Sequence, residues 1–243
     1  MSSHAIAQVA APSESKGVEF SVGLGAARAP VYLGSDESET RALPFARAVW
    51  SNGWFAGFDG VGYTFPSTSP LRYGLRLSID PGRDEEDALA LAGMGDIETR
   101  PEMGAFFSYS LLPGLQGVGH LRLGSGNDRD GALAELGIRA MRPLGARQQL
   151  LAGISVTWAN QAAMQSRYGV DAVQSAASGY RIYSPGAGLQ DVELSLGWGY
   201  ALTPAARVRF SLSASGLLGD ARDSPIVRRS RNNSAMLLLE YRP

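Results

Sequence analysis

The amino-acid sequence predicts an all-β fold, a transmembrane antiparallel up-and-down β-barrel of about twelve strands. Three observations carry this prediction. Apolar and polar residues alternate with period two in segments of about ten residues, the length that spans a bilayer as a tilted strand. Gly, Pro, Asn and Asp separate the segments. The polar face is rich in Gly, Ser and charge pairs and is nearly free of lysine, which suits a crowded barrel lumen.

The first alternating segments lie at residues 17–27, 71–80, 103–111 and 132–140. Their apolar faces are Val18, Phe20, Val22, Leu24 and Ala26; Leu71, Tyr73, Leu75, Leu77 and Ile79; Met103, Ala105, Phe107, Tyr109 and Leu111; and Ala132, Ala134, Leu136 and Ile138. The opposite faces hold mainly Gly, Ser, Glu and Arg. Because side chains of a strand alternate between its two faces, one face of each strand is expected to meet lipid and the other the lumen.

The later segments show the same pattern at residues 150–158, 191–202 and 207–214 and in the run that ends at Tyr241. Aromatic residues gather towards the ends of the apolar faces, as in the aromatic girdles of membrane barrels. They are Trp50, Trp54, Tyr73, Tyr109, Trp158, Trp198, Tyr200 and Tyr241. A soluble β-sandwich is the alternative, but its outward face is commonly rich in Lys, Thr and Glu.

The charged residues of the polar face are predicted to form a lumen network in which guanidinium and carboxylate groups pair across neighbouring strands. This network comprises Arg72, Arg76, Glu102, Arg122, Glu135, Arg139, Asp191, Glu193, Arg207, Arg209 and Glu240.

Composition excludes several other classes of protein. Of the 243 residues, 30 are Gly, two are His and none is Cys. Disulfides, thiolate zinc sites, cysteine nucleophiles and His-rich metal centres are therefore excluded, and we expect neither metal nor cofactor. A formal charge of −1 gives no basic footprint for nucleic acid. No apolar run reaches the roughly 18 residues of a transmembrane helix.

The chain divides into a short tail and one barrel domain. Residues 1–16 are small, polar and aperiodic, and are interpreted as a disordered tail or the remnant of a signal peptide. Ala5-Ile6-Ala7 has the small-x-small form of a signal peptidase site, although no apolar stretch precedes it. Residues 17–243 form the predicted outer-membrane barrel.

Loop lengths fix the strand count. The short connections lie near residues 51–52, 66–70, 112–114, 142–146 and 203–205, and the long ones at 28–41, 81–100, 159–187 and 218–231. Splitting residues 53–65 at Asp59-Gly60, a hairpin dipeptide, gives twelve strands. All long connections then lie at one end and both termini at the other, as in bacterial barrels. Ten strands is the fallback.

Several loop motifs resemble the MltA-interacting protein (MipA)/OmpV family of Gram-negative outer-membrane proteins. The matching positions are Pro30, Tyr32, Gly34, Ser35, Asp36, Gly82, Arg83, Asp84, Gly95, Asp96, Trp158, Tyr168, Gly169, Gly219, Asp220, Asp223, Ser224 and Pro225. Their order and spacing extend over about residues 17–242. One departure is the final Tyr241-Arg242-Pro243, because family chains usually end in aromatic-Arg-Phe.

The resemblance implies an outer-membrane β-barrel in contact with membrane lipid and lipopolysaccharide. The family's named member is similar to a scaffold that joins a lytic transglycosylase to a murein synthase. Other members are described as adhesins or antigens, or are linked to antibiotic susceptibility. The leading hypothesis is thus a scaffold for murein enzymes, and the second is a barrel that binds or transports a small molecule such as an antibiotic.

Two alternatives concern particular residues. An acidic rim for a divalent cation could be formed at the outer end, although the spacing of its residues fits no EF-hand. Its members would be Asp36, Asp84, Glu85, Glu86, Asp87 and Asp96. The competing interpretation has Arg83 pair with Asp96 or Asp220 and hold the loops over the pore.

A hydrolase would need His120 beside a serine such as Ser108 or Ser110 and a carboxylate such as Glu135. No Gly-x-Ser-x-Gly motif is present, so we do not expect an enzyme.

Overall fold

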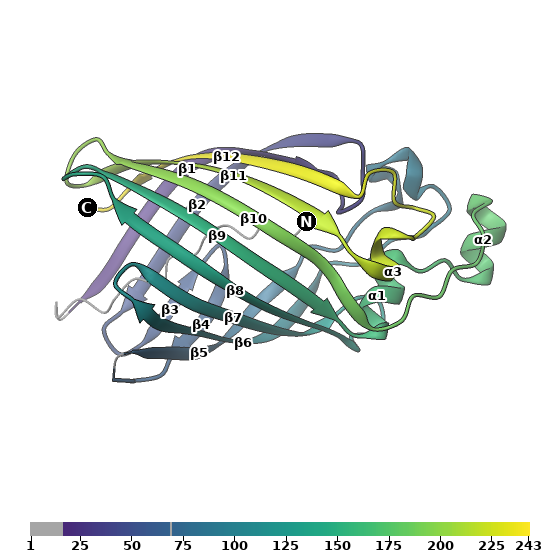
Figure 1. The fold of residues 1–243 in the computed structure, drawn as a ribbon, viewed down its shortest axis with the longest axis horizontal. Coiled ribbons are helices and arrows are strands. Elements are labelled where there is room, and N and C mark those ends of the chain that lie inside the picture. The colour runs from purple at the N-terminus through teal and green to yellow at the C-terminus, as the bar shows by residue number, and fades with distance from the viewer. Residues whose placement is uncertain (1–16, 69) are drawn as a thin grey trace.

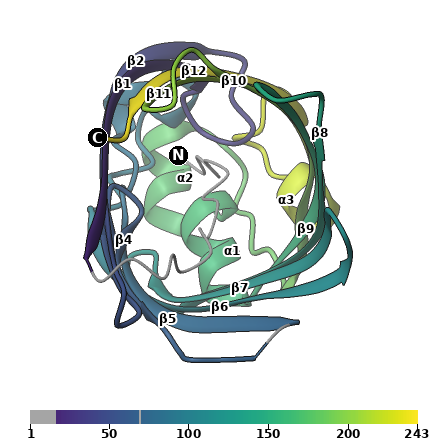
Figure 2. The same ribbon diagram turned by 90° about the vertical axis from the view of Figure 1, so that its left-hand side faces the viewer.

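The structure, a computed structural model that describes residues 17–68 and 70–243, is a closed antiparallel barrel of twelve strands (Figures 1 and 2). Each strand pairs with its neighbours in sequence, and β1 closes the barrel against β12. The strands are β1 Val18–Pro30, β2 Ser38–Trp50, β3 Trp54–Gly57, β4 Gly60–Thr64, β5 Leu71–Asp80, β6 Arg100–Leu112, β7 Leu115–Ser125, β8 Gly131–Pro143, β9 Gln148–Ala159, β10 Gly188–Ala201, β11 Ala206–Leu217 and β12 Arg231–Tyr241. The predicted fold class and strand count are confirmed. The predicted tail, residues 1–16, lies outside the described residues.

The two ends of the barrel differ in their connections. One end, called the turn end below, carries the short turns together with the start of β1 and the end of β12. The other, the loop end, carries the connections at 31–37, 81–99, 126–130, 160–187 and 218–230. The hairpin of β3 and β4 turns at Phe58-Asp59, one residue before the predicted Asp59-Gly60, and Gly60 follows as the first residue of β4 with φ 115°. A Cβ atom there would lie 2.2 Å from the Leu77 carbonyl oxygen, so the turn requires glycine.

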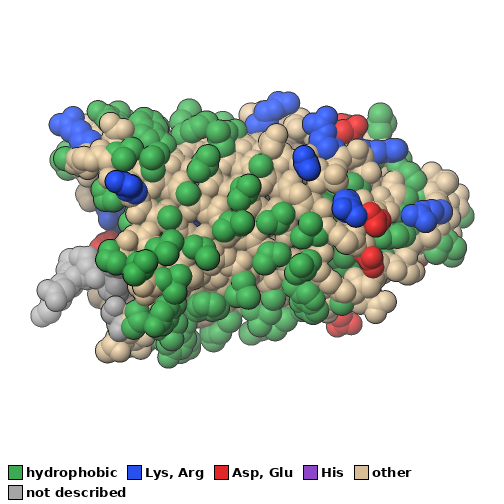
Figure 3. Space-filling view, viewed as in Figure 1, with side chains coloured by type: hydrophobic (Ala, Val, Ile, Leu, Met, Phe, Trp, Pro, Cys, Tyr) green, Lys and Arg blue, Asp and Glu red, His purple; other side chains and the backbone are tan. Residues whose placement is uncertain are grey.

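The outer wall is apolar. Outward side chains such as Leu24 and Ile79 are 66 % and 69 % exposed, and Figure 3 shows hydrophobic side chains over the wall with most of the charges towards the loop end. Such a continuous exposed apolar surface would be a liability in water but is what a lipid-facing barrel needs. The period-two alternation of the sequence therefore corresponds to lipid on one face and lumen on the other.

The aromatic side chains gather at the turn end. Trp54, Tyr63, Phe65 and Tyr73 form a row in which successive ring centroids are 5.3 Å apart. Of the eight predicted girdle residues only Trp158 lies near the loop end, where β9 ends. The predicted aromatic girdle therefore lies at the turn end, while tyrosines of the loop end such as Tyr32 and Tyr168 are packed inside the loops.

The loop end contains short helices that the sequence did not reveal. They are α1 Gln161–Tyr168, α2 Ala172–Ser178 and α3 Gly219–Arg222, with the 3₁₀ turns η1 Glu85–Asp87 and η2 Leu89–Leu91. The side chains of Asn160 and Asp171 accept hydrogen bonds from the first turns of α1 and α2. Among the described residues, no helix has the length and hydrophobicity needed to cross a membrane.

Candidate functional site

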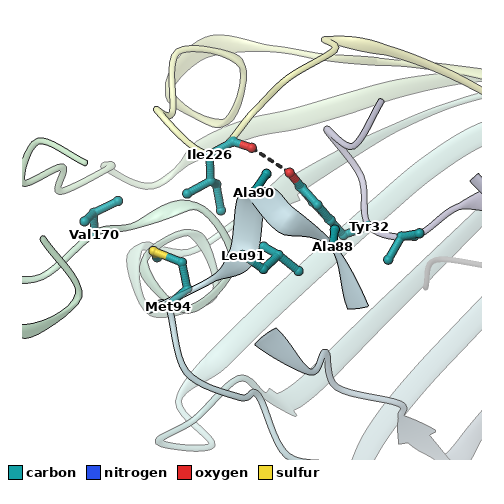
Figure 4. Close-up of a cluster of buried hydrophobic side chains, with 8 residues drawn as sticks. Tyr32, Ala88, Ala90, Leu91, Met94, Val170 and Ile226 are labelled. Carbon is teal, nitrogen blue, oxygen red and sulfur yellow. Dashed lines mark hydrogen bonds between the residues drawn. The ribbon is translucent and has the colours of Figure 1, made fainter. Parts of the chain in front are cut away.

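A hydrophobic cluster closes the loop end of the barrel. It combines residues of four separate connections: Val31, Tyr32, Ala88, Ala90, Leu91, Met94, Val170 and Ile226 (Figure 4). Leu91, Val170 and Ile226 are fully buried. Loops pack so tightly only when each supplies apolar side chains to a shared core, so these connections act as one body, here called the loop plug.

A second cluster anchors the loop plug to the barrel wall. Its members are Leu133, Ala159, Ala163, Met164, Tyr168, Leu217 and Ala221. They join the ends of β8, β9 and β11 to α1 and α3. Figure 2 looks into the barrel from the turn end and shows α1 and α2 across the far mouth. The loop plug is therefore attached to the strands that it covers.

Hydrogen bonds tie the connections to one another. The Tyr32 hydroxyl donates to the Ile226 carbonyl at 2.7 Å (Figure 4), and the Ser224 hydroxyl donates to the Tyr168 carbonyl at 2.6 Å. Asn232 of β12 accepts from the Gly34 N–H and donates to the Ser35 carbonyl. Burial raises the pKa of Tyr32 to about 12, so its hydroxyl remains a donor at neutral pH.

Arg83 is buried inside the loop plug. Its guanidinium donates to the Arg167 carbonyl at 3.1 Å and lies 6.0 Å from the centre of the Tyr32 ring. Arg167 in turn pairs with Asp80 at 2.7 Å. Burial lowers the pKa of Arg83 to about 10. The predicted pairing of Arg83 with Asp96 or Asp220 is wrong, because Asp96 accepts from the Glu85 N–H of its own loop and Asp220 accepts from the Gly186 N–H of the connection at 160–187.

The acidic residues of the connection at 81–99 fold that connection. Glu85 accepts from the N–H groups of Gly93 and Gly95 at 3.1 and 3.0 Å, and Asp96 accepts from the Glu85 N–H at 2.8 Å. In residues 17–68 and 70–243, no cluster of three or more metal-binding side chains occurs. These carboxylates serve as backbone caps, which is the turn chemistry expected of Asp and Glu.

The remaining motif positions also belong to the loop end. Gly34, Gly82, Gly95 and Gly219 have positive φ, Gly169 ends α1, Trp158 faces outward on β9, and Asp223 pairs with Arg222 at 3.2 Å. Asp36 and Asp84 are exposed, and Pro225 lies between Ser224 and the buried Ile226. The motifs thus encode the shape of the loop plug.

Below the loop plug, the lumen holds a cavity of about 550 Å³. Its lining extends from Thr203 and Arg242 at the turn end to Leu33 and Gln190 beneath the loop plug. A second cavity of about 30 Å³ lies within the loop plug beside Arg83 and Tyr168; it holds about one water molecule. The lumen is accordingly hollow below and closed above.

The walls of the cavity differ in character. Leu43, Phe45, Val49, Phe58, Met236 and Leu238 line it near β2 and β12. Six arginines and four carboxylates also line it: Arg47, Arg72, Arg122, Arg207, Arg209 and Arg242, with Glu19, Asp191, Glu193 and Glu240. The Nε–H groups of Arg47 and Arg209 are buried and have no hydrogen-bond partner among the described residues. The cavity is amphipathic and carries an excess of positive charge.

The eleven predicted lumen residues all lie on inward-facing positions of their strands. The structure brings together Arg122 with Glu102 at 3.7 Å and Arg209 with Glu240 at 2.8 Å. Asp191 accepts from Gln190 at 2.7 Å. Within the described part of the chain, Arg76, Arg139 and Arg207 have no carboxylate at salt-bridge distance. Strand alternation places side chains on a face but does not specify their partners.

Sequence reasoning missed two ion pairs of the lumen. Arg47 pairs with Asp59 of the β3–β4 turn at 3.0 Å, and Arg242 pairs with Glu19 at 3.3 Å. Glu19 could have been found, because it lies on the polar face of the first alternating segment. The sequence places Asp59 only in a turn, and its pairing with Arg47 depends on how far β3 and β4 extend along the barrel wall.

His120 lies 3.7 Å from Glu135 on the neighbouring strand. In the described residues its side chain has no hydrogen bond to Ser108 or Ser110. In the described part of the chain, the contact recognised at this histidine is therefore the one with Glu135.

A closed barrel with an apolar exterior, a charged lumen and one end covered by loops defines an outer-membrane-type β-barrel. Two solved porins share this fold: the KdgM porin, with 8 % identity, and the NanC porin, with 12 % identity. Each comparison covers 91 % of this chain and 98 % of the porin, with a TM-score of 0.50. No curated protein matches the chain.

The family comparison is more specific. Residues 22–243 match the family described as MltA-interacting protein MipA, so the chain belongs to the MipA family.

Proposed function

We propose that this chain is a scaffold in the outer membrane of a Gram-negative envelope, and that it holds a murein-remodelling enzyme at its turn end. The family description names an MltA-interacting protein, which supports a lytic transglycosylase as partner and, through it, a murein synthase. The single structural observation that carries the proposal is the closed loop end, since a scaffold needs no open pore. Lipid and lipopolysaccharide would surround the wall.

The turn end offers a basic contact surface. Short turns of bacterial barrels face the periplasm, where murein lies. Arg142, Arg147, Arg207 and Arg242 are exposed there, so an acidic patch on the partner would fit them. The turns are short and their combined area is expected to fall below the roughly 1,000 Å² of a stable interface. The contact should therefore be weak and salt-sensitive.

The test is co-purification of a lytic transglycosylase after chemical crosslinking of envelope membranes. Charge reversal of Arg142 and Arg147 to Glu should reduce recovery of the enzyme at least fivefold. Charge reversal of Arg28 and Arg229, which are exposed at the loop end, is the matched control and should leave recovery unchanged. Equal recovery from both double variants would refute a scaffold that binds through its turns.

A second candidate, a barrel that binds or transports a small molecule, is favoured by the cavity of about 550 Å³. This volume lies within the usual range of about 300–1,000 Å³ for small-molecule sites. We expect no hydrolase activity. Purified protein assayed against lipid, peptide and ester substrates should be inactive, and an activity that disappears in His120→Ala would contradict this.

A further inference from the structure

The barrel wall is incomplete on one side of β2. Only Arg47–Val49 of β2 pair with β3, whereas all thirteen residues of the strand pair with β1. The cause is the shortness of β3 and β4, which have four and five residues. The last contact of the β3–β4 hairpin with β2 is the hydrogen bond that the Phe58 N–H donates to the Ala46 carbonyl at 3.2 Å. Residues 38–45 therefore present one strand edge with no strand beside it in the described structure.

This free edge lies at the depth of the hydrocarbon. Ala42, Pro44 and Ala46 are opposite Ala26, Leu24 and Val22 of the lipid-facing stripe of β1. Because the Ala46 carbonyl points to β3, the backbone groups of the even-numbered residues of β2 point to the same side. Pro44 is thus placed where it has no N–H to leave unpaired, as expected for a proline at a sheet edge. Unpaired backbone groups are costly in lipid, so an edge here requires an explanation.

The lumen side of the gap is the apolar part of the cavity. Leu43, Phe45 and Phe58 line the cavity, and the rings of Phe45 and Phe58 are 5.3 Å apart. On the lipid-facing side, the residues of β2 are small: Ala42, Pro44 and Ala46 are exposed there. Apolar side chains therefore continue from the lipid face of β2, past its free edge, into the lumen.

We propose that the gap between β2 and the β3–β4 hairpin is a lateral port through which an anionic single-chain lipid enters the cavity from the bilayer. Its acyl chain lies against Phe45 and Phe58, and its head group lies towards the arginines of the turn end. The excess of arginine over carboxylate in the lining and the unpartnered Nε–H groups of Arg47 and Arg209 supply the charge complementarity. The proposal rests on the second candidate function, a ligand-binding lumen, and is independent of enzyme docking.

Binding is tested with the protein in lipid nanodiscs, using pyrene-labelled hexadecanoic acid and the matching neutral pyrene-labelled alcohol. We expect saturable binding of the acid and at least tenfold weaker binding of the alcohol. Phe45→Ser should weaken binding of the acid at least tenfold and Arg207→Gln several-fold. Arg139→Gln, which removes a lumen arginine outside the cavity lining, is the control and should bind as the unmodified protein does. Heat modifiability on gels verifies that each variant is folded.

Entry through the port is tested by lengthening the hairpin. Two additional residues in each of β3 and β4, inserted between Phe58 and Asp59, would extend the pairing of β3 with β2 to Phe45 and narrow the gap beside that side chain. Uptake of the pyrene acid from the bilayer should slow at least tenfold, while binding of water-soluble octanoate from the turn end stays unchanged. The same four residues inserted between Gly145 and Ala146 are the control.

The outcomes separate the two claims. Absence of saturable binding would overturn both the ligand-binding lumen and the port. Saturable binding with unaltered uptake after lengthening would leave the lumen site intact and overturn the port. The edge could instead be covered by a second copy of this chain. Since the chain has no cysteine, Ala42→Cys reports this directly, and a disulfide-linked dimer in membranes would also overturn the port.

Discussion

At the scale of single residues, the loop plug depends on polar groups that are buried with their partners. Tyr32 illustrates this: its ring belongs to the hydrophobic cluster, while its hydroxyl reaches the Ile226 carbonyl across the mouth. The buried side chains of Asn232, Ser224 and Arg83 likewise form hydrogen bonds to the backbone of another connection. A buried donor that loses its acceptor loses more than the modest net value of the bond, so these contacts fix one arrangement of the loops.

Deprotonation of Tyr32 should destabilise the loop plug at high pH. Burial raises the pKa of Tyr32 from 10 to about 12. A group whose pKa is higher in the folded state adds stability in full below its unfolded pKa, and that stability is lost as pH rises through about 12. Titration of tyrosinate absorbance should show one late phenol fewer in Tyr32→Phe, which should also weaken the loop plug by about 1 kcal/mol. Tyr241→Phe, an exposed control, should leave the late phenol of Tyr32 in place.

The charged residues of the lumen should differ in how much they contribute to the free energy of unfolding. Arg209→Leu leaves the buried Glu240 without its partner at 2.8 Å, and should reduce the free energy of unfolding by about 2–4 kcal/mol, since the arginine is partly exposed. Arg139→Leu, with no carboxylate at salt-bridge distance in the described chain, should cost less. The temperature of heat modifiability on gels measures both. A larger shift for Arg139→Leu would mean that pairing does not determine the stability of the lumen.

At the scale of elements, strands were predictable and loop helices were not. Period-two alternation repeats in most of the long strands, although β2 is apolar on both faces, and the parity of long and short connections placed even the half-length β3 and β4. The helices α1 and α2 have eight and seven residues, too short for a hydrophobic period to be evident in sequence. Residues 85–94 form only the 3₁₀ turns η1 and η2, and the Glu85 carboxylate accepts from the backbone N–H groups of Gly93 and Gly95.

Asn160 should be the residue on which α1 most depends. Its side chain accepts from the N–H groups of Ala163 and Ala132 at 3.0 Å and donates to the Asp130 carbonyl at 2.7 Å. Asn160→Ala removes the helix cap and the link to the adjacent loop together, and should cost about 2 kcal/mol. Hydrogen exchange of residues 161–168 should accelerate accordingly. Asn233→Ala, at an exposed position of β12, should leave this exchange unchanged.

At the scale of the whole molecule, the fold was predictable and the closed mouth was not. Alternation, turn residues and loop parity are local features of the sequence, so they specify a barrel and which connections share an end. The loop plug joins residues as distant as Tyr32 and Ile226, and no local pattern records which loops meet. The same limit explains why lumen residues could be placed but not paired. It also explains why the free edge of β2 could not be anticipated, because it depends on where a neighbouring hairpin stops.

The closed mouth predicts the electrical behaviour of the barrel. The cavity of about 550 Å³ extends from the turn end to the loop plug, where the connections pack into two buried hydrophobic clusters. The unmodified protein in a planar bilayer should therefore conduct negligibly. Replacing residues 162–186 with a short Gly-Ser linker removes most of α1 together with α2, including Met164, Tyr168 and Val170 of the two clusters, and should produce steady ion conductance. Shortening the exposed turn at 144–147 is the control and should not. An unmodified protein that conducts steadily would show that the loops open in the membrane, and the transport function would then replace the scaffold.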